Sequence, residues 1–268
     1  MSHQRLQLDA LVCDLDGVLY RGAEPVPGAA ETISSLRAGG IRVVLATNNA
    51  TKTPEQYVER LARFGVEATP EELVTSAVVT TEEIERRGWG GHSVFVIGGD
   101  GIKASLHAIG MTFLEGIDAR RADVVVVSGT SEMTYDDIRT AAFAVRGGAR
   151  FLATNDDSTF PAPDGLWPGA GATVAAVETA SGRSAEVMGK PYRPMMQAIE
   201  RRLNGRARIG VVGDQPATDL AGGRAMGWTT VLVLSGVTDE TAAAAERPAP
   251  DVTVPSLVEL RELLLGPD

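Results

Sequence analysis

Two aspartates, Asp14 and Asp16, stand two residues apart where an apolar run near the start of the chain meets Gly17. The run, residues 10–12, is typical of a buried strand of a parallel sheet, and ligands of such sheets bind beyond the carboxyl ends of the strands. Residues i and i+2 of a strand share a face, and a glycine lets the chain turn after them. One carboxylate could therefore attack a substrate while the other donates a proton. Taken alone, such a pair more often belongs to a solvated loop or a cation-binding turn.

Two further segments offer groups that bind phosphate. The apolar run 41–46 ends at Thr47 and Asn48, whose side chains and backbone can donate hydrogen bonds to a phosphate oxygen. The alternative for this pair is a turn that caps the strand. Lys190 lies between a glycine and a proline, and its ammonium would act as a point charge on a phosphoryl group. The alternative for a lone lysine is an ordinary surface position.

A fourth segment again ends an apolar run in an acid. Residues 209–212 are followed by Gly213 and Asp214, and Asp219 comes five residues after Asp214. Hard cations such as Mg²⁺ prefer oxygen ligands of this type. The alternative is a helix N-terminus at which Thr218 and Asp219 complement the helix dipole. Each of the four segments is weak evidence alone, but their order along one chain is specific.

The elements that must position these residues follow from the hydrophobic pattern. Apolar strands alternate with helical patterns, which predicts a parallel sheet with helices on both sides. Between the early and the late motifs lies a long segment with its own predicted strands (93–97, 123–127, 149–153) and helices (101–109, 134–145). We infer an inserted domain over residues 81–183, with residues 1–80 and 184–268 forming the core. A loop is expected over 242–249 and a closing helix over 255–265.

The four motifs resemble those of the haloacid dehalogenase-like hydrolase superfamily. The chain is most similar to subclass IIA, the phosphatases that include the nitrophenyl phosphatases, the phosphoglycolate phosphatases and NagD. Residues 152–161 and 168–178 are similar to further segments of that subgroup, so the likeness covers nearly the whole chain. The chain departs from the pattern at Asp156, where many members have proline, and at Gln215, where many have arginine. The resemblance implies an α/β fold: a Rossmann-like, doubly wound parallel sheet with an inserted α/β cap domain of the C2 type.

The resemblance also implies a phosphomonoester hydrolase with a defined division of roles. Asp14 would attack phosphorus and become an aspartyl phosphate, and Asp16 would protonate the leaving alkoxide and then activate water. Mg²⁺ would bridge Asp14, the backbone carbonyl of Asp16 and Asp214. Asp219 would orient this group of ligands rather than join it.

The remaining candidate residues would bind the substrate. Lys190, Thr47 and Asn48 would hold and neutralise the phosphoryl oxygens. Asn155 and Asp157, in the predicted cap, are candidates to recognise the leaving group. The alternative for this second pair is that both side chains only cap the turn after the preceding strand.

The sequence leaves the substrate open among small phosphorylated metabolites: phosphoglycolate, glycerol phosphate, sugar phosphates, pyridoxal phosphate or nucleotides, with nitrophenyl phosphate as an artificial substrate. One alternative is a phosphomutase that uses the same aspartyl phosphate, but such relatives carry a small helical cap soon after the first motif. Here the insertion follows Thr47. A second alternative is a non-catalytic phosphate-binding protein, which should lack Asp14 or Asp16. A homodimer formed through the caps would fit the resemblance.

Composition narrows the remaining classes. The 268 residues carry a net charge of −10, so a uniformly basic surface for nucleic acid is not expected. The same charge would repel phosphate esters, which makes a metal and a local lysine more necessary. Cys13 is the single cysteine, and the three histidines show no metal-ligand spacing. With no signal-peptide segment and no apolar run of membrane-spanning length, we expect a cytoplasmic protein without membrane partners.

Overall fold

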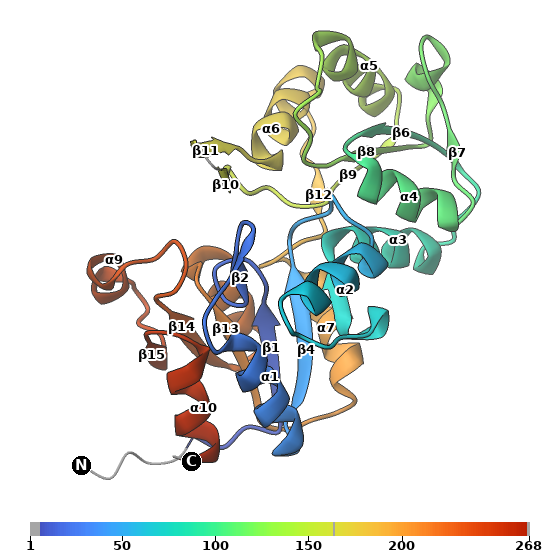
Figure 1. Cartoon of the computed structure of the whole chain (residues 1–268). Helices are drawn as coiled ribbons and strands as arrows, with labels where there is room; N and C mark the ends of the chain where they lie inside the picture. The colour runs from blue at the N-terminus through green and yellow to red at the C-terminus, as the bar shows by residue number, and fades with distance from the viewer. Residues whose placement is uncertain (1–5, 163, 267–268) are drawn as a thin grey trace. The chain divides into compact units, whose positions relative to one another are not determined.

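The computed structural model describes residues 6–162 and 164–266, and the chain folds into two compact units. The first unit contains the chain up to Thr47, residues 55–74 and the chain from Met195 onward, and the second contains residues 48–54 and 75–194. Each unit is built on its own parallel sheet (Figure 1). The predicted α/β class is therefore confirmed. The assignment of residues 81–183 as a cap stays a prediction.

The sheet of the first unit has the strand order β15-β14-β13-β1-β4-β5. Its strands are β1 (Ala10–Asp14), β4 (Arg42–Thr47), β5 (Leu73–Thr75), β13 (Ile209–Gly213), β14 (Thr229–Val233) and β15 (Val252–Val254). Strand β1 is central and pairs in parallel with both β4 and β13. The register places Cys13 opposite Val212 on one side and Asp14 opposite Ala46 on the other. The carboxyl ends of these three strands therefore meet at one edge of the sheet.

The first unit also contains a short hairpin, and several helices that pack against the sheet. These elements are β2 (Tyr20–Arg21), β3 (Glu24–Pro25), α1 (Ala29–Ala38), α2 (Pro54–Arg63), η1 (Pro70–Glu72), α7 (Arg193–Leu203), the π-helical turn η3 (Pro216–Leu220), α8 (Ala221–Ala225), α9 (Glu240–Ala245) and α10 (Leu257–Leu265). Ile33 of α1, Leu61 of α2 and Leu260 of α10 share one core with Leu11 and Cys13 of β1. Helix α7 lies behind the sheet in Figure 1. No helix in the described part of the chain is long and apolar enough to cross a bilayer.

The end of the chain matches the sequence prediction in its last helix and differs from it just before. The closing helix is present as α10, which begins after the Ser256 capping box with Glu259. The loop predicted over 242–249 is wrong in its first half, because α9 extends to Ala245. This helix is a run of alanines with no buried residue, so it has helix propensity but no apolar periodicity to reveal it.

The sheet of the second unit has the order β12-β9-β8-β6-β7. Its elements are α3 (Ser76–Arg86), β6 (Ser93–Ile97), α4 (Asp100–Ala108), β7 (Thr112–Phe113), η2 (Asp118–Arg121), β8 (Val124–Val127), α5 (Tyr135–Arg146), β9 (Arg150–Ala153), β10 (Thr159–Ala162), β11 (Gly165–Pro168), α6 (Ala170–Ser181) and β12 (Glu186–Val187). Helices α5 and α6 pack together on one face, where their alanines and valines meet the strand side chains. Helices α3 and α4 pack together on the other side of the sheet in Figure 1. The strands and helices predicted for this segment are all present.

Candidate active site

Three buried carboxylates meet at the carboxyl edge of the first sheet. Asp14 ends β1, Asp214 follows β13, and Asp219 lies in the turn η3. One oxygen from each carboxylate lies within 4.8 Å of the other two. Like charges buried this close together repel one another strongly unless a cation or a proton neutralises them. A group of carboxylate oxygens is also the donor set that hard divalent cations prefer, so the residues present fit such an ion.

Glycines form a cradle around these carboxylates. A Cβ atom added at Gly17 would lie 2.3 Å from Oδ2 of Asp214, and one added at Gly236 would lie 1.9 Å from the same atom. A Cβ added at Gly213 would lie 2.2 Å from Oδ2 of Asp219. Gly17 also has a φ of 81°, a conformation that favours glycine. The backbone therefore approaches the acidic group closely, and this close approach explains why these positions are glycine.

The loop after β14 fixes two of the acid-bearing segments. The backbone N–H of Val237 donates to Oδ2 of Asp214 at 2.7 Å, and the hydroxyl of Thr238 donates to the backbone oxygen of Asp214 at 2.5 Å. The hydroxyl of Ser235 donates to the backbone oxygen of Gly17 at 2.7 Å. Sequence reasoning missed this loop. The available signal was its position, because Ser-Gly-Val-Thr follows a buried strand as the other motifs do.

Asp16 lies in a tight turn just beyond β1. The backbone oxygen of Leu15 closes this turn by accepting from the N–H of Leu19 at 2.9 Å. Asp16 is not among the three clustered carboxylates, and it is half-buried. Burial raises the pKa of Asp16, and this is only partly offset by the charge of Arg60 and a hydrogen bond from the N–H of Gly22. A carboxyl group with a raised pKa retains its proton more readily, which suits a proton donor.

The predicted site residues of the second unit form one hydrogen-bonded group around Asn48. The side-chain amide of Asn48 donates to the backbone oxygen of Lys190 and to the carboxylate of Asp157, both at 3.1 Å. Its side-chain oxygen accepts the N–H of Lys190 at 2.6 Å. The Asn155 amide donates to the backbone oxygen of Asn48 at 2.8 Å, and its oxygen accepts the N–H of Asp157 at 3.2 Å. A Cβ at Gly189 would lie 2.6 Å from Oδ1 of Asn48, which explains the glycine before Lys190.

The structure therefore places the predicted residues in two sets. Within the first unit it brings together Asp14, Asp214 and Asp219. Asp16 lies two residues beyond Asp14, and Thr47 is buried at the end of β4. Within the second unit it brings together Asn48, Lys190, Asn155 and Asp157. In this second set the Asn48 side chain holds the backbone of Lys190 and the carboxylate of Asp157.

Comparison with known proteins identifies the family. The sequence profile described as "Haloacid dehalogenase-like hydrolase" matches residues 11–112, and a second profile described as "HAD-hydrolase-like" matches residues 187–260. An acid sugar phosphatase from Staphylococcus aureus is 36% identical over 232 residues, which cover 86% of this chain and 88% of that protein. The chain belongs to the haloacid dehalogenase-like hydrolases. The resemblance seen in the four motifs is thereby confirmed.

Solved structures of this superfamily support the same subclass. The p-nitrophenyl phosphatase from Archaeoglobus fulgidus is 30% identical, with a TM-score of 0.89 over 96% of this chain and 100% of that one. A glycerol phosphate phosphatase from Mycobacterium tuberculosis, solved in complex with magnesium, is 32% identical, with a TM-score of 0.86 over 97% of this chain and 77% of that one. These similarities place the chain with the phosphatases of subclass IIA. The prediction of a phosphatase from the sequence is therefore confirmed.

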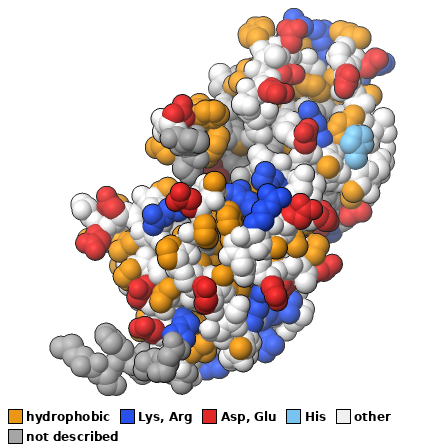
Figure 2. All heavy atoms as spheres, viewed as in Figure 1, with side chains coloured by type: hydrophobic (Ala, Val, Ile, Leu, Met, Phe, Trp, Pro, Cys, Tyr) orange, Lys and Arg blue, Asp and Glu red, His pale blue; other side chains and the backbone are white. Residues whose placement is uncertain are grey.

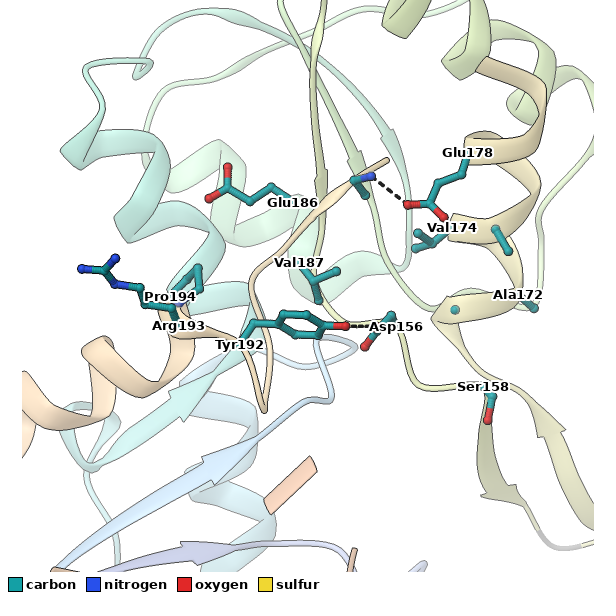
Figure 3. A pocket seen from close by; sticks show the side chains of 13 residues that line it. Asp156, Ser158, Ala172, Val174, Glu178, Glu186, Val187, Tyr192, Arg193 and Pro194 are labelled. Carbon is teal, nitrogen blue, oxygen red and sulfur yellow. Dashed lines mark hydrogen bonds between the residues drawn. The ribbon is translucent and has the colours of Figure 1, made fainter. Parts of the chain in front are cut away.

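The second unit of this haloacid dehalogenase-like chain also contains a cavity of 680 Å³, next to the start of α6 and β12 (Figure 3). On one side the hydroxyl of Tyr192 donates to the carboxylate of Asp156, and this hydrogen bond raises the pKa of Tyr192 to about 12. Elsewhere on the wall, Glu178 accepts the N–H of Ala185 at 2.8 Å. Asp156, the departure from the family pattern, therefore bonds Tyr192, whereas its neighbour Asp157 bonds Asn48.

Proposed function

We propose that this chain is a magnesium-dependent phosphomonoester hydrolase that works through an aspartyl phosphate on Asp14. The observation that carries the proposal is the group of three buried carboxylates at the strand ends of the first unit. When bound there, magnesium would neutralise the carboxylates and the phosphoryl oxygens and hold the phosphorus in line for attack. Asp14 and Asp214 would hold the ion together with the backbone carbonyl of Asp16, and Asp219 would orient them.

The reaction proposed for the two aspartates has two halves. In the first, an oxygen of the Asp14 carboxylate forms a bond to phosphorus while the ester P–O bond breaks, and the proton of Asp16 passes to the departing oxygen. In the second, Asp16 removes a proton from water, which attacks the phosphorus and releases inorganic phosphate from Asp14. Support for Asp16 as the proton donor comes from its half-buried position and its raised pKa.

Binding of the phosphoryl group is proposed for Lys190, Thr47 and Asn48. The ammonium of Lys190 would offset the charge on the phosphoryl oxygens, which is greatest in the transition state. Asn48 would contribute in part through Lys190, since its side chain holds both the N–H and the carbonyl of that residue. The substrate would be a small phosphorylated metabolite, and the names of the relatives favour sugar phosphates and glycerol phosphate. A homodimer through the cap and a cytoplasmic location stay predictions.

The deciding experiment is a panel of phosphomonoesters incubated with the purified chain and magnesium. Release of inorganic phosphate from glycerol phosphate, a sugar phosphate, phosphoglycolate or a nucleotide supports the hydrolase. A phosphomutase would instead give an isomeric phosphate ester with little free phosphate. A non-catalytic binding protein would leave every ester intact, nitrophenyl phosphate included.

Removal of the metal should have a large effect. Activity is expected to fall by about a hundredfold or more in EDTA, because a metal in such a site supplies several kcal/mol of charge stabilisation. Added magnesium should restore it, whereas calcium should not, since its larger and looser coordination misplaces the nucleophile relative to phosphorus. The measurement is the rate of phosphate release before and after chelation. Full activity in enzyme shown by elemental analysis to be metal-free would contradict the proposal.

The role of the Asn155 and Asp157 pair can be tested separately. Sequence reasoning proposes that they recognise the leaving group, but both side chains contact Asn48 within the chain. We expect Asp157→Ala to lower kcat/KM for all esters alike, by about tenfold. The change removes the carboxylate that accepts from the Asn48 amide, and the Asn48 side chain in turn holds the backbone of Lys190. Asp156→Ala is the matched control and should stay within about twofold of wild type. A changed ranking among esters in the Asp157 variant would support leaving-group recognition instead.

A further inference from the structure

The hairpin of β2 and β3 directly follows Asp16 and is anchored at two points within the first unit. Its strands pair Tyr20 with Pro25 and Arg21 with Glu24, so Gly22 lies in the turn. The guanidinium of Arg21 donates to the backbone oxygen of Ser235, in the loop that also holds Asp214. On the other side, the guanidinium of Arg60, from α2, donates to the backbone oxygen of Gly22. The hairpin therefore cannot shift without breaking one of these contacts.

Arg60 is itself held in a fixed position by aromatic rings. Its guanidinium carbon lies 4.1 Å from the centre of the Tyr20 ring and 5.8 Å from that of Phe64. The two rings pack against each other with centres 5.4 Å apart, and Tyr20 is fully buried. In the view of Figure 2, basic side chains gather on the surface over α2. Arg60 and Arg63 occupy the last turn of that helix. A cation over an aromatic ring is attracted by the negative face of the ring, so the Tyr20 ring helps to hold Arg60 in place.

Gly22 links Arg60 to the catalytic aspartate. Its carbonyl oxygen accepts from Arg60. On the first strand of the same hairpin, the backbone oxygen of Tyr20 accepts the N–H of Gly17, the residue after Asp16, at 2.7 Å. Gly22 has a φ of 53°, and this left-handed conformation at the hairpin turn is easily adopted by glycine. The position of the hairpin, and with it that of the adjoining turn that carries Asp16, therefore depends on the contact with Arg60.

We propose that Arg60 is a positioning residue that keeps Asp16 aligned for proton donation by holding the Gly22 turn. This inference rests on the proposed function. In the first half of the reaction the ester P–O bond breaks as Asp14 bonds to phosphorus, and the proton of Asp16 passes to the departing oxygen. An alkyl ester releases a strongly basic oxygen and needs this proton, whereas nitrophenyl phosphate releases a stable anion and hardly needs it. Misalignment of Asp16 should therefore affect the two kinds of ester unequally.

The test compares kcat/KM for the best alkyl ester of the panel with kcat/KM for nitrophenyl phosphate. This parameter covers only the steps up to transfer of the phosphoryl group to Asp14, so the later attack of water does not obscure it. Arg60→Met keeps a long side chain beside Tyr20 but has no donor for Gly22. We expect it to lower kcat/KM for the alkyl ester by about ten- to a hundredfold and that for nitrophenyl phosphate by less than about threefold.

Two further variants test whether the effect is specific to Arg60. Arg63→Met makes the same change at an exposed position in the same turn of α2, and should leave both values within about twofold of wild type. Arg60→Lys retains the charge, should show the same selectivity with a smaller loss, and serves as the test if Arg60→Met does not fold. Equal losses for both esters, no loss for the alkyl ester, or the same selective loss in Arg63→Met would overturn the proposal. Failure of the proposed function itself would be seen separately, as absence of phosphate release by the wild-type enzyme.

Discussion

Asp14→Asn is expected to lower phosphatase activity by at least about a thousandfold while leaving the fold intact. The amide is nearly the same size as the carboxylate but is a poor nucleophile, so the bond from Asp14 to phosphorus cannot form. The change also removes one of three clustered negative charges, which should relieve repulsion in the buried site rather than unfold it. The measurement is kcat/KM on nitrophenyl phosphate, with thermal unfolding as the check on folding.

Asp9→Asn is the matched control for this variant. Asp9 immediately precedes β1, whereas Asp14 ends it, and its carboxylate pairs with Arg208 at 2.6 Å in an exposed position. The same chemical change there should leave kcat/KM within about twofold of wild type, since exposed ion pairs contribute little. The intact mass of the Asp14→Asn variant should be checked, because slow hydrolysis of the asparagine at position 14 to aspartate would regenerate the nucleophile. Turnover of Asp14→Asn close to the wild-type value would refute the aspartyl phosphate mechanism.

The acid-bearing strand ends could be predicted from the sequence because the physical rule behind them is local. A buried strand shows as an apolar run, and parallel strands bring their carboxyl ends to one edge of the sheet. Asp14 and Asp214 could therefore be placed together although they are distant in the chain, and the structure groups their carboxylates with that of Asp219. The strands and helices of the second unit were predictable for the same reason, since their apolar periodicity is regular.

Other parts of the site depend on contacts that no local pattern reveals. The place of Asn48 after a strand predicts a phosphate ligand. In the structure its side chain holds the backbone of Lys190, 142 residues later in the chain. The contact between Arg21 and Ser235 joins residues 214 apart. Arg60 lies on a helix whose pattern predicts only a buried face, and its contact with Gly22 depends on where the hairpin turn lies. Such pairings become visible only once the fold brings the segments together.

Gly236→Ala should weaken metal binding by displacing Asp214. The added methyl would lie 1.9 Å from Oδ2 of Asp214, the oxygen that accepts the N–H of Val237. The methyl would also lie 2.4 Å from Cβ of Asp214, so the loop must shift as well as the carboxylate. Disturbing the groups that orient metal ligands typically costs ten- to a hundredfold in metal affinity. We expect a loss of about that size in magnesium affinity, measured as the magnesium concentration that gives half-maximal activity.

The way the loss responds to magnesium distinguishes a displaced ligand from a damaged fold. If Asp214 is only turned aside, excess magnesium should recover much of the activity, because binding is weakened by mass action rather than abolished. Gly90→Ala is the control, since Gly90 is exposed and its nearest neighbour to an added Cβ is 3.8 Å away. Thr238→Val, which removes the hydroxyl that donates to the Asp214 backbone, should shift the magnesium requirement in the same direction but less. An unchanged magnesium requirement in Gly236→Ala would mean that Asp214 does not hold the metal, because a ligand displaced by a methyl group cannot retain its affinity.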